Sequence, residues 1–339
     1  MVTVSIIGGS GFVGGELLRI LLGHPEVEIV QVTSERFSGS YLKTVHPHLR
    51  GRTQLKFESA SHLKDVDAMF LALPHGYSSN RITEFDDHAE KIIDLSSDFR
   101  FASPETYSKW YGKDHPNSAF LEKFVYGLPE LWRNEIRDAD YVAVPGCNAT
   151  ISILSLFPLR DLIRNVTINA TVGTSEGGRT HSEASHHPIR SGSMRTYRPV
   201  LHRHIGEIEE QIQASGIAFS ATSVDIVRGA MVNIHVQTDR FLTEKDLWKI
   251  YRRQYGAEPF VRLINERRGI FRYPDPRLVA GTNFADIGFV IDPHTGGIVV
   301  IGAIDNLMKG AAGQSVQAFN LMNGFEETLG LDFHPIFPL

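Results

Sequence analysis

The stretch MVTVSIIGGSGFVG, residues 1–14, decides the fold class of this 339-residue chain. Val2–Ile7 is a short apolar run that predicts a buried strand, and Phe12–Leu22 has the apolar spacing of a helix. The glycine-rich turn between them fits the pattern G-x-G-x-x-G, in which glycines let the backbone approach a pyrophosphate at a helix N-terminus. A purely structural turn is the alternative. Because a strand precedes the pattern and a helix follows it, we predict a dinucleotide site. Its residues are Gly8, Ser10, Gly11, Phe12, Val13 and Gly14.

Alternating strands and helices follow through the first half of the chain, which predicts an α/β fold with helices on both faces of a parallel sheet. After the strand at 141–144 the strands are separated by long connections, which favours an α+β domain with a mixed sheet. We therefore predict a Rossmann-type domain at 1–147 and a catalytic domain at 148–305. The expected strands are Val2–Ile7, Val27–Thr33, Ala68–Leu73, Lys91–Leu95, Tyr141–Val144, Val166–Val172, Ala218–Asp225, Met231–Thr238, Asp286–Ile291 and Gly297–Ala303, with a final helix at Asn306–Phe325.

Composition narrows the class of protein. The chain is 42% hydrophobic and 22% charged, with a net charge of −5, so nothing points to nucleic-acid or membrane binding. A single cysteine excludes an internal disulfide framework and a multi-cysteine zinc site, and it suits a reducing cytosol. The start of the chain lacks the pattern of a signal peptide. We expect a cytoplasmic enzyme without a metal.

The second predicted strand ends in Thr33-Ser34-Glu35-Arg36. An acidic residue here accepts the ribose 2′-hydroxyl of NAD, and Glu35 keeps that option open. Ser34 and Arg36 instead offer a hydroxyl and a guanidinium suited to a 2′-phosphate. A solvated turn is the alternative. The pattern favours NADP(H).

Cys147, the only cysteine, lies in Val-Pro-Gly-Cys-Asn-Ala-Thr, residues 144–150, after a strand and before an apolar helical run. A thiol at a helix N-terminus has a lowered pKa, and the same amides can hold an oxyanion. A buried structural cysteine is an equally good interpretation from position alone. A base has to come from elsewhere in the chain, and His202-Arg203-His204-Ile205-Gly206-Glu207 supplies a candidate. There His204 and Glu207 share a helix face at i, i+3. A metal pair formed by His202 and His204, or a solvated face, is the alternative.

These segments together resemble the N-acetyl-glutamyl-phosphate reductases and their aspartate-semialdehyde dehydrogenase relatives. Within that family the chain is most similar to the carrier-protein branch, the [LysW]-L-2-aminoadipate 6-phosphate reductases, over essentially its whole length. The other matching stretches are residues 45–51, 73–76, 94–100, 185–188, 273–277 and 303–307.

The resemblance implies roles for particular residues. Cys147 is the nucleophile, and His204 supported by Glu207 is the acid/base. It also implies a C-terminal helix, about 306–339, that returns to the first domain, and an oligomer (a dimer or tetramer) built on the second. Residues 10–13 and 34–36 contact NADP(H), and Asn306 lies near the nicotinamide. The substrate is held by Arg100, Asn148, Arg179, His202 and Arg203. The chain departs from its branch at Glu35, where a basic residue is common, and at Pro145.

The implied reaction reduces an acyl phosphate to a semialdehyde through a cysteine thioester, as a step of lysine biosynthesis, with arginine biosynthesis left open as a second pathway. The polar stretch Gly173–His204 carries five arginines against Glu176 and Glu183, and this basic excess favours an acidic carrier protein as the partner. We therefore expect carrier-linked 2-aminoadipate 6-phosphate as the substrate, with glutamate 5-phosphate left open as a second one. Free N-acetyl-glutamyl phosphate is the close alternative. A zinc hydrolase and a non-catalytic NADP-sensing module are the alternatives from other classes.

Overall fold

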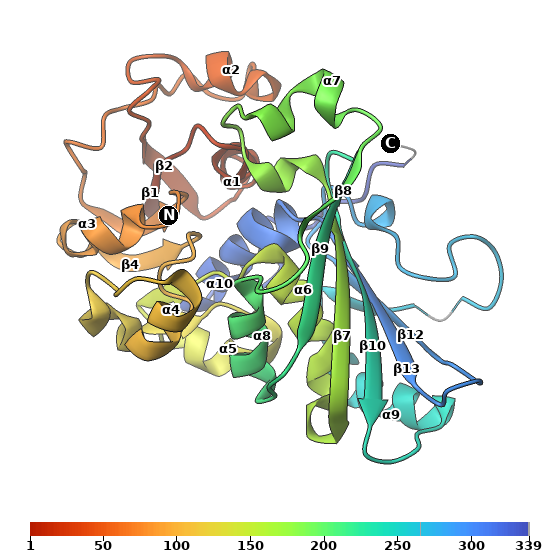
Figure 1. Cartoon of the computed structure of the whole chain (residues 1–339). Coiled ribbons are helices and arrows are strands. Elements are labelled where there is room, and N and C mark those ends of the chain that lie inside the picture. Colours follow the sequence, from red (N-terminus) through yellow and green to blue (C-terminus); the bar gives the residue numbers. More distant parts are fainter. Residues whose placement is uncertain (265, 338–339) are drawn as a thin grey trace. The chain divides into compact units, whose positions relative to one another are not determined.

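The computed structural model describes residues 1–264 and 266–337 (Figure 1). The chain divides into two compact units. Of the described residues, the first unit contains Met1–Pro145 and Ala311–Asp332, and the second contains those of 146–310 and 333–337. Within the described ranges, no helix is long and apolar enough to cross a membrane.

The first unit is built on a six-stranded sheet in the order β2-β1-β3-β4-β6-β5, and every neighbouring pair is parallel. The predicted parallel sheet is therefore confirmed, although the short strand β5 was not predicted. The strands are β1 (Val2–Ile7), β2 (Val27–Val32), β3 (Val66–Leu71), β4 (Ala89–Asp94), β5 (Phe124–Tyr126) and β6 (Tyr141–Ala143). The helices are α1 (Phe12–Leu21), α2 (Leu42–Val45), α3 (Tyr77–Asp86), α4 (Pro104–Tyr111), α5 (Pro129–Arg137) and α10 (Gly313–Met322).

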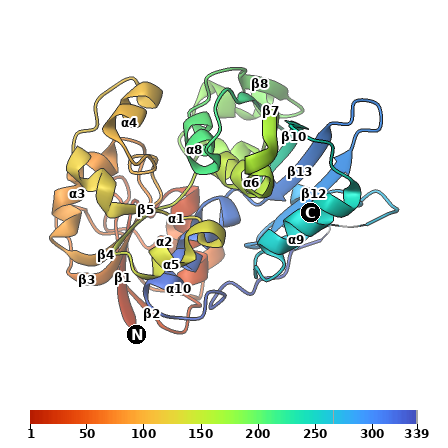
Figure 2. The same cartoon turned by 90° about the horizontal axis from the view of Figure 1, so that it is seen from below.

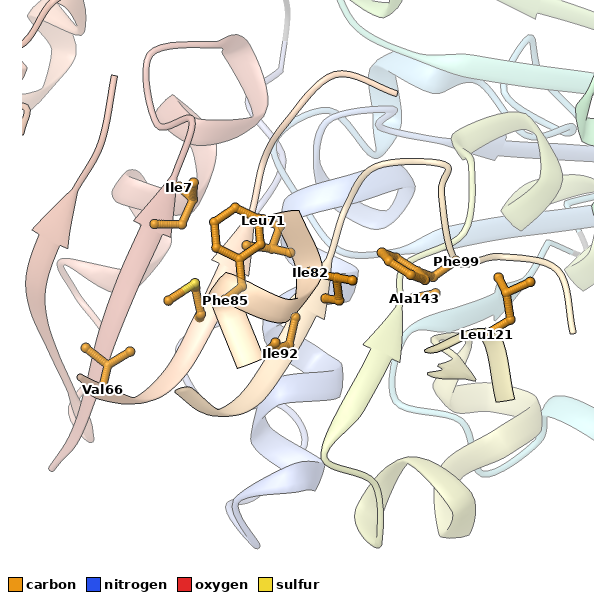
Figure 3. Close-up of a cluster of buried hydrophobic side chains, with 10 residues drawn as sticks. Ile7, Val66, Leu71, Ile82, Phe85, Ile92, Phe99, Leu121 and Ala143 are labelled. Atoms are coloured by element: carbon orange, nitrogen blue, oxygen red, sulfur yellow. The ribbon is translucent and has the colours of Figure 1, made fainter. Parts of the chain in front are cut away.

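Alternate side chains of β3 pack against helices on opposite faces of this sheet, as the two-residue period of a strand requires. Leu71 belongs to a buried cluster with Ile82 and Phe85 of α3 (Figure 3). Phe70 points the other way, and its ring centroid lies 5.5 Å from that of Phe319 on α10. The C-terminal helix therefore packs on the first sheet, which is why residues 311–332 belong to the first unit.

The second unit contains a seven-stranded mixed sheet in the order β11-β12-β13-β10-β7-β9-β8. Strand β7 is parallel to β9 but antiparallel to β10, and β10 is antiparallel to β13, so the predicted mixed sheet is confirmed. The strands are β7 (Ile163–Val172), β8 (Met194–Arg198), β9 (Ala218–Val224), β10 (Ala230–Thr238), β11 (Val261–Leu263), β12 (Ala285–Ile291) and β13 (Ile298–Ile304).

Helices α6 (Cys147–Leu156), α8 (His204–Ile212) and α9 (Glu244–Tyr255) cover one face of this mixed sheet (Figure 2). The hydroxyl of Tyr251 on α9 donates to the backbone oxygen of Ser155 at 2.6 Å, which fixes α9 against the end of α6. Helix α6 has no charged residue, and its small polar side chains alternate with apolar ones, so it can be buried on all sides. Asn148–Leu156 are all buried.

Other elements also differ from the prediction, among them the unpredicted strand β11. The stretch Gly173–His204 is not all loop, because it contains the short helix α7 (His187–Arg190) and the edge strand β8. Strand β8 has the polar sequence MRTYR and no buried face, so it lacks the alternation that identifies a strand. The final helix is shorter than predicted: α10 ends at Met322, after a π-helical turn at Met308–Ala312.

Asp94, the last residue of β4, is completely buried where the sheet ends. The backbone N–H and the hydroxyl of Ser96 both donate to its carboxylate, at 3.2 and 2.7 Å. Burial, with the nearby charge of Asp98, raises the pKa of Asp94 to about 7. Asp98 is also buried, yet hydrogen bonds from His75, Ser79 and Gly76 hold its pKa below the ordinary value. The pKa values of the two carboxyl groups are therefore shifted in opposite directions.

The raised pKa makes a prediction about stability. The protonated form of Asp94 is favoured by folding, so its contribution is present below pH 4 and is lost as the pH rises through about 7. In an Asp94→Asn variant this loss is absent. We compare the free energies of unfolding of the variant and the wild type, measured in urea at pH 5 and pH 8. The difference between them should change by about 2–3 kcal/mol in favour of the variant as the pH rises. Asp87→Asn, at an exposed position, serves as the control. A difference that does not change with pH would contradict the assignment.

Candidate functional site

Cys147 is the first residue of α6 and is half-buried. Gly146 precedes it in an extended conformation (φ −67°, ψ 146°), and its carbonyl accepts the Thr150 N–H at 2.8 Å, so the helix starts at the cysteine. The sulfur therefore lies in the positive field of the helix N-terminus, which favours the thiolate. Behind it, a Cβ on Gly310 would lie 2.6 Å from the Cβ of Cys147. Only glycine allows the chain to pass this close.

His204 begins α8 and is brought to the residue before the cysteine. A Cβ on Gly146 would lie 2.2 Å from Nε2 of His204, so the imidazole packs directly on the Gly146 backbone. Glu207, one helical turn later, has Oε1 at 3.8 Å from the same Nε2. Its other oxygen accepts the Gly146 N–H at 3.0 Å. The predicted cysteine, histidine and glutamate are thus assembled within the second unit, from α6 and α8.

His202 lies beside His204 but has a different task. Its Nδ1 accepts the backbone N–H of His204 at 3.2 Å, which satisfies a donor at the start of α8. Its ring lies 4.6 Å from the ring of His204 and 5.0 Å from that of Phe219. Burial, together with the positive charges of Arg203 and Arg198, lowers the pKa of His202 to about 4. His202 is therefore neutral at neutral pH and orients the helix that carries His204.

Glu176 is a site residue that sequence reasoning missed. It lies in the turn Thr174–Gly177 after β7, and its Oε1 accepts hydrogen bonds from the Cys147 thiol at 3.1 Å and the Asn148 amide at 2.7 Å. The Tyr197 hydroxyl of β8 donates to the other oxygen at 3.4 Å. The sequence showed only an acidic residue in a basic stretch, because no local pattern links residue 176 to residue 147.

The remaining predicted site residues of the second unit are two buried asparagines and two exposed arginines. Asn306 is buried, accepts the Gly229 N–H at 2.8 Å and donates to the Ser175 hydroxyl at 2.9 Å, so it anchors the turn that carries Glu176. Asn148 is completely buried. Arg179 and Arg203 are exposed.

Arg100 belongs to the first unit and lies at the carboxyl ends of β4 and β6. It is 9% exposed, and its Nε donates to the carbonyl of Val144 at 2.8 Å, while an NH2 group reaches the carbonyl of Leu95 at 3.4 Å. The guanidinium therefore ties the ends of these two strands together, within three residues of Cys147 in the sequence.

The glycine turn of the first unit contains glycines with two different functions. A Cβ on Gly9 would lie 2.4 Å from a Val32 methyl, and one on Gly14 would lie 2.5 Å from the Gly9 carbonyl oxygen. These two glycines allow α1 to pack closely on the sheet. Gly11, which caps α1, has no atom within 4 Å of its Cβ position. Open space at a helix N-terminus fits a bound phosphate group.

The residues after β2 are arranged around this turn. The Ser34 hydroxyl donates to the Ser10 hydroxyl at 2.9 Å. Both oxygens of Glu35 accept hydrogen bonds, from the Ala60 N–H at 2.8 Å and from the Ser59 hydroxyl. Arg36 is exposed, with its guanidinium carbon 5.2 Å from the Phe37 ring centroid. Glu35 is therefore occupied by the chain itself, whereas Arg36 is presented to solvent. Of the remaining predicted residues, Phe12 is exposed, Gly8 (φ +81°) packs against Ala72, and Val13 is half-buried.

Two family models match the chain, and together they cover most of it. Residues 3–139 match the NAD binding domain of semialdehyde dehydrogenases, and residues 147–306 match their dimerisation domain. The chain belongs to the semialdehyde dehydrogenase family. It is therefore an oxidoreductase with a nicotinamide dinucleotide as its cofactor, and the resemblance noted from the sequence is confirmed.

Curated relatives lie in the carrier-protein branch. A protein of Thermomicrobium roseum named putative [LysW]-L-2-aminoadipate 6-phosphate reductase is 49% identical, with both chains covered completely. The [LysW]-L-2-aminoadipate 6-phosphate reductase of Deinococcus radiodurans is 46% identical over 99% of this chain and 98% of its own. A protein of Pyrococcus horikoshii named putative [LysW]-L-2-aminoadipate/[LysW]-L-glutamate phosphate reductase is 48% identical over both whole chains. Aspartate semialdehyde dehydrogenase II of Vibrio cholerae shares the fold, with a TM-score of 0.73 at 17% identity over 96% of this chain and 99% of that one.

The contact between Gly146 and His204 yields a direct test of the assembled residues. In a Gly146→Ala variant the new methyl group would occupy the position of the His204 imidazole and displace it. Reductase activity should fall at least about 100-fold, the lower end of the range for losing a positioned acid/base. Steady-state assays measure the loss, and circular dichroism checks the fold. Gly23→Ala is the control, since its Cβ meets only the Ile20 carbonyl at 3.6 Å. Full activity of the Gly146 variant would show that His204 has no part in the reaction.

Proposed function

We propose that this chain reduces carrier-linked 2-aminoadipate 6-phosphate, and also the glutamate 5-phosphate analogue, to the semialdehyde with release of phosphate. NADPH is the reductant, the carrier is a small acidic protein, and the step belongs to lysine biosynthesis, with arginine biosynthesis for the shorter substrate. The observation that carries the proposal is Cys147 at the start of α6 with His204 packed on the preceding residue. Relatives at 45–49% identity bear names of this activity.

The chemistry of each residue follows from its position. Cys147 attacks the acyl carbon, phosphate leaves, and a thioester remains on the sulfur. The backbone N–H groups at the start of α6 are the donors that would hold an oxyanion on that carbon. The bound cofactor supplies the hydride that reduces the thioester. His204, oriented by Glu207, returns a proton when the sulfur is released as the leaving group.

In the first unit the cofactor's pyrophosphate fits at Gly11, the open position at the start of α1. The 2′-phosphate of NADP fits the Ser10–Ser34 hydroxyl pair and the exposed guanidinium of Arg36. NAD would need a free carboxylate for its ribose hydroxyl. Glu35 already accepts hydrogen bonds from residues 59 and 60, which supports NADP over NAD.

Cofactor choice can be tested at Arg36. In an Arg36→Ala variant the KM for NADPH should rise about 10–100-fold, the value of one charge-assisted contact to phosphate. The KM for NADH should change little, because NADH lacks the 2′-phosphate. Arg137→Ala is the control, since that arginine ends α5 and lies at the opposite edge of the parallel sheet. Equal effects on the two cofactors would refute a 2′-phosphate contact.

The basic stretch Gly173–His204 supports a carrier-linked substrate, although not with all five of its arginines. Arg190 is buried and donates to the Ser223 hydroxyl and the Val224 carbonyl, so it has a structural role. The exposed arginines are Arg179, Arg198 and Arg203, with Arg195 partly exposed. Beside them the side chains of Met194 and Leu201 are 77% and 76% exposed. A basic surface with apolar side chains fits an acidic protein better than a small free substrate.

The alternative functions account for fewer of the observed contacts and surface features. N-acetyl-glutamyl phosphate would undergo the same chemistry but would leave the basic surface without a role. For a zinc hydrolase, His202 and His204 would need a third ligand. Among the described residues, neither histidine belongs to a group of three possible ligands, and Nδ1 of His202 already accepts a hydrogen bond. A non-catalytic NADP-sensing module would not need a cysteine positioned at a helix start.

A comparative assay in the reverse direction decides between these functions. Carrier-linked aminoadipate semialdehyde and glutamate semialdehyde should support phosphate-dependent reduction of NADP. Free N-acetyl-glutamate semialdehyde should be at least 100-fold poorer in kcat/KM. A Cys147→Ala variant should lose at least about 1,000-fold, as expected for a nucleophile. Equal use of the free substrate would assign the chain to the N-acetyl branch, and full activity of the alanine variant would refute the mechanism.

A further inference from the structure

The carboxylate of Glu176 is surrounded by hydrogen-bond donors, and one of them is the nucleophile. The Cys147 thiol and the Asn148 amide both donate to Oε1, and the Tyr197 hydroxyl donates to Oε2. These donors come from α6 and β8, while Glu176 lies on the turn after β7. Three donors directed at one carboxylate favour its ionised form. The proton between Glu176 and Cys147 therefore lies on the sulfur.

A thiolate and a carboxylate whose atoms are 3.1 Å apart would repel each other in this half-buried site. Removing the remaining proton from the pair is therefore unfavourable. Burial raises the pKa of Glu176, although its donors and the charge of Arg203 oppose the rise. Its proton affinity is thus shifted towards that of a thiol, which makes transfer between the two groups easier.

Other charged or titratable groups face this pair from every element packed around it. Glu207 and His204 of α8 both contact Gly146, the residue before Cys147. Glu207 accepts the Gly146 N–H, and the His204 imidazole packs on the Gly146 backbone. Glu176 remains the acceptor of the thiol hydrogen bond at 3.1 Å. The groups that face the pair are Tyr197 on β8 and His202, Arg203, His204 and Glu207 at the start of α8. The segment that contains Gly310 also carries Asp305, whose carboxylate is paired with Arg228, and Lys309, whose ammonium lies 5.9 Å from the Phe260 ring centroid.

We propose that Glu176 and Cys147 share a single proton at neutral pH. Glu176 keeps the sulfur as a thiol in the free protein and receives the thiol proton when the sulfur attacks. In that step the C–S bond forms and the C–O bond to phosphate breaks. Phosphate leaves with the electron pair, and the proton moves from sulfur to the Glu176 carboxylate, so negative charge never builds up on both groups together. The transfer step rests on the proposed function, whereas the sharing of the proton does not.

Two pH profiles of the full-length protein test this. The first is the rate of alkylation of Cys147, the only cysteine, by iodoacetamide, which reports the thiolate in the free protein. In Glu176→Gln the repelling charge is gone, so the midpoint should fall by at least one pH unit and alkylation at pH 7 should be about 10-fold faster. The second is the acid limb of kcat/KM for the acyl phosphate. It should move to higher pH, because the variant has to form a thiolate without an adjacent acceptor.

Opposite shifts of the two profiles are the expected signature, since a purely structural role would move neither. Glu183→Gln, an exposed glutamate of the same stretch, is the matched control and should match the wild type in both. Glu176→Asp retains the charge at a longer distance, so its alkylation midpoint should lie between the other two. It also decides the question if the glutamine variant does not fold, as judged by thermal melting.

Alkylation midpoints of both Glu176 variants equal to that of the wild type would overturn the shared proton. A shifted alkylation midpoint with an unshifted acid limb would overturn the transfer step alone. Because alkylation needs no substrate, its result stands even if the protein turns over none of the acyl phosphates tested, so failure of the proposed function is recognised separately.

Discussion

The hydrogen bond from the Gly146 N–H to the Glu207 carboxylate joins the starts of two helices, and the candidate catalytic site depends on it. It fixes the first turn of α6, which carries Cys147, against the first turn of α8, which carries His204. A charged acceptor makes this contact stronger than one between neutral groups. Glycine is required at 146 because the imidazole occupies the space of a side chain. Gly146 thus determines both how closely the two helix starts approach and where the His204 imidazole lies.

Around this contact the second unit holds polar groups in a largely buried environment, where each has to be satisfied by a partner. Asn306 does so for the turn that carries Glu176, and His202 does so for the start of α8. Several residues predicted to bind ligands therefore also position other residues. A buried side chain with all its hydrogen-bonding groups directed at protein has less capacity left for substrate.

The charged groups around the sulfur and the arginines of residues 173–204 affect different parts of the candidate site. The sulfur is exposed to opposing influences, since the helix dipole favours the thiolate while Glu176 disfavours it. Such opposition keeps a nucleophile close to its working protonation state at neutral pH without leaving it permanently ionised. The arginines of residues 173–204 lie outside this balance, with the exception of Arg203, whose charge acts on both Glu176 and His202.

The sequence by itself determined the parallel sheet, the glycine turn and the helix that begins at Cys147, because these depend on local periodicity and on residues close together in the chain. It also paired His204 with Glu207, since i, i+3 spacing on one helix is a local relation. Only the tertiary structure brought Glu176 to Cys147, as the two are 29 residues apart and meet through the packing of β7, β8 and α6. Likewise, the edge strand β8 and the anchoring roles of His202 and Asn306 arise from long-range contacts. No pattern of neighbouring residues encodes such contacts, because folding decides which distant polar groups satisfy one another.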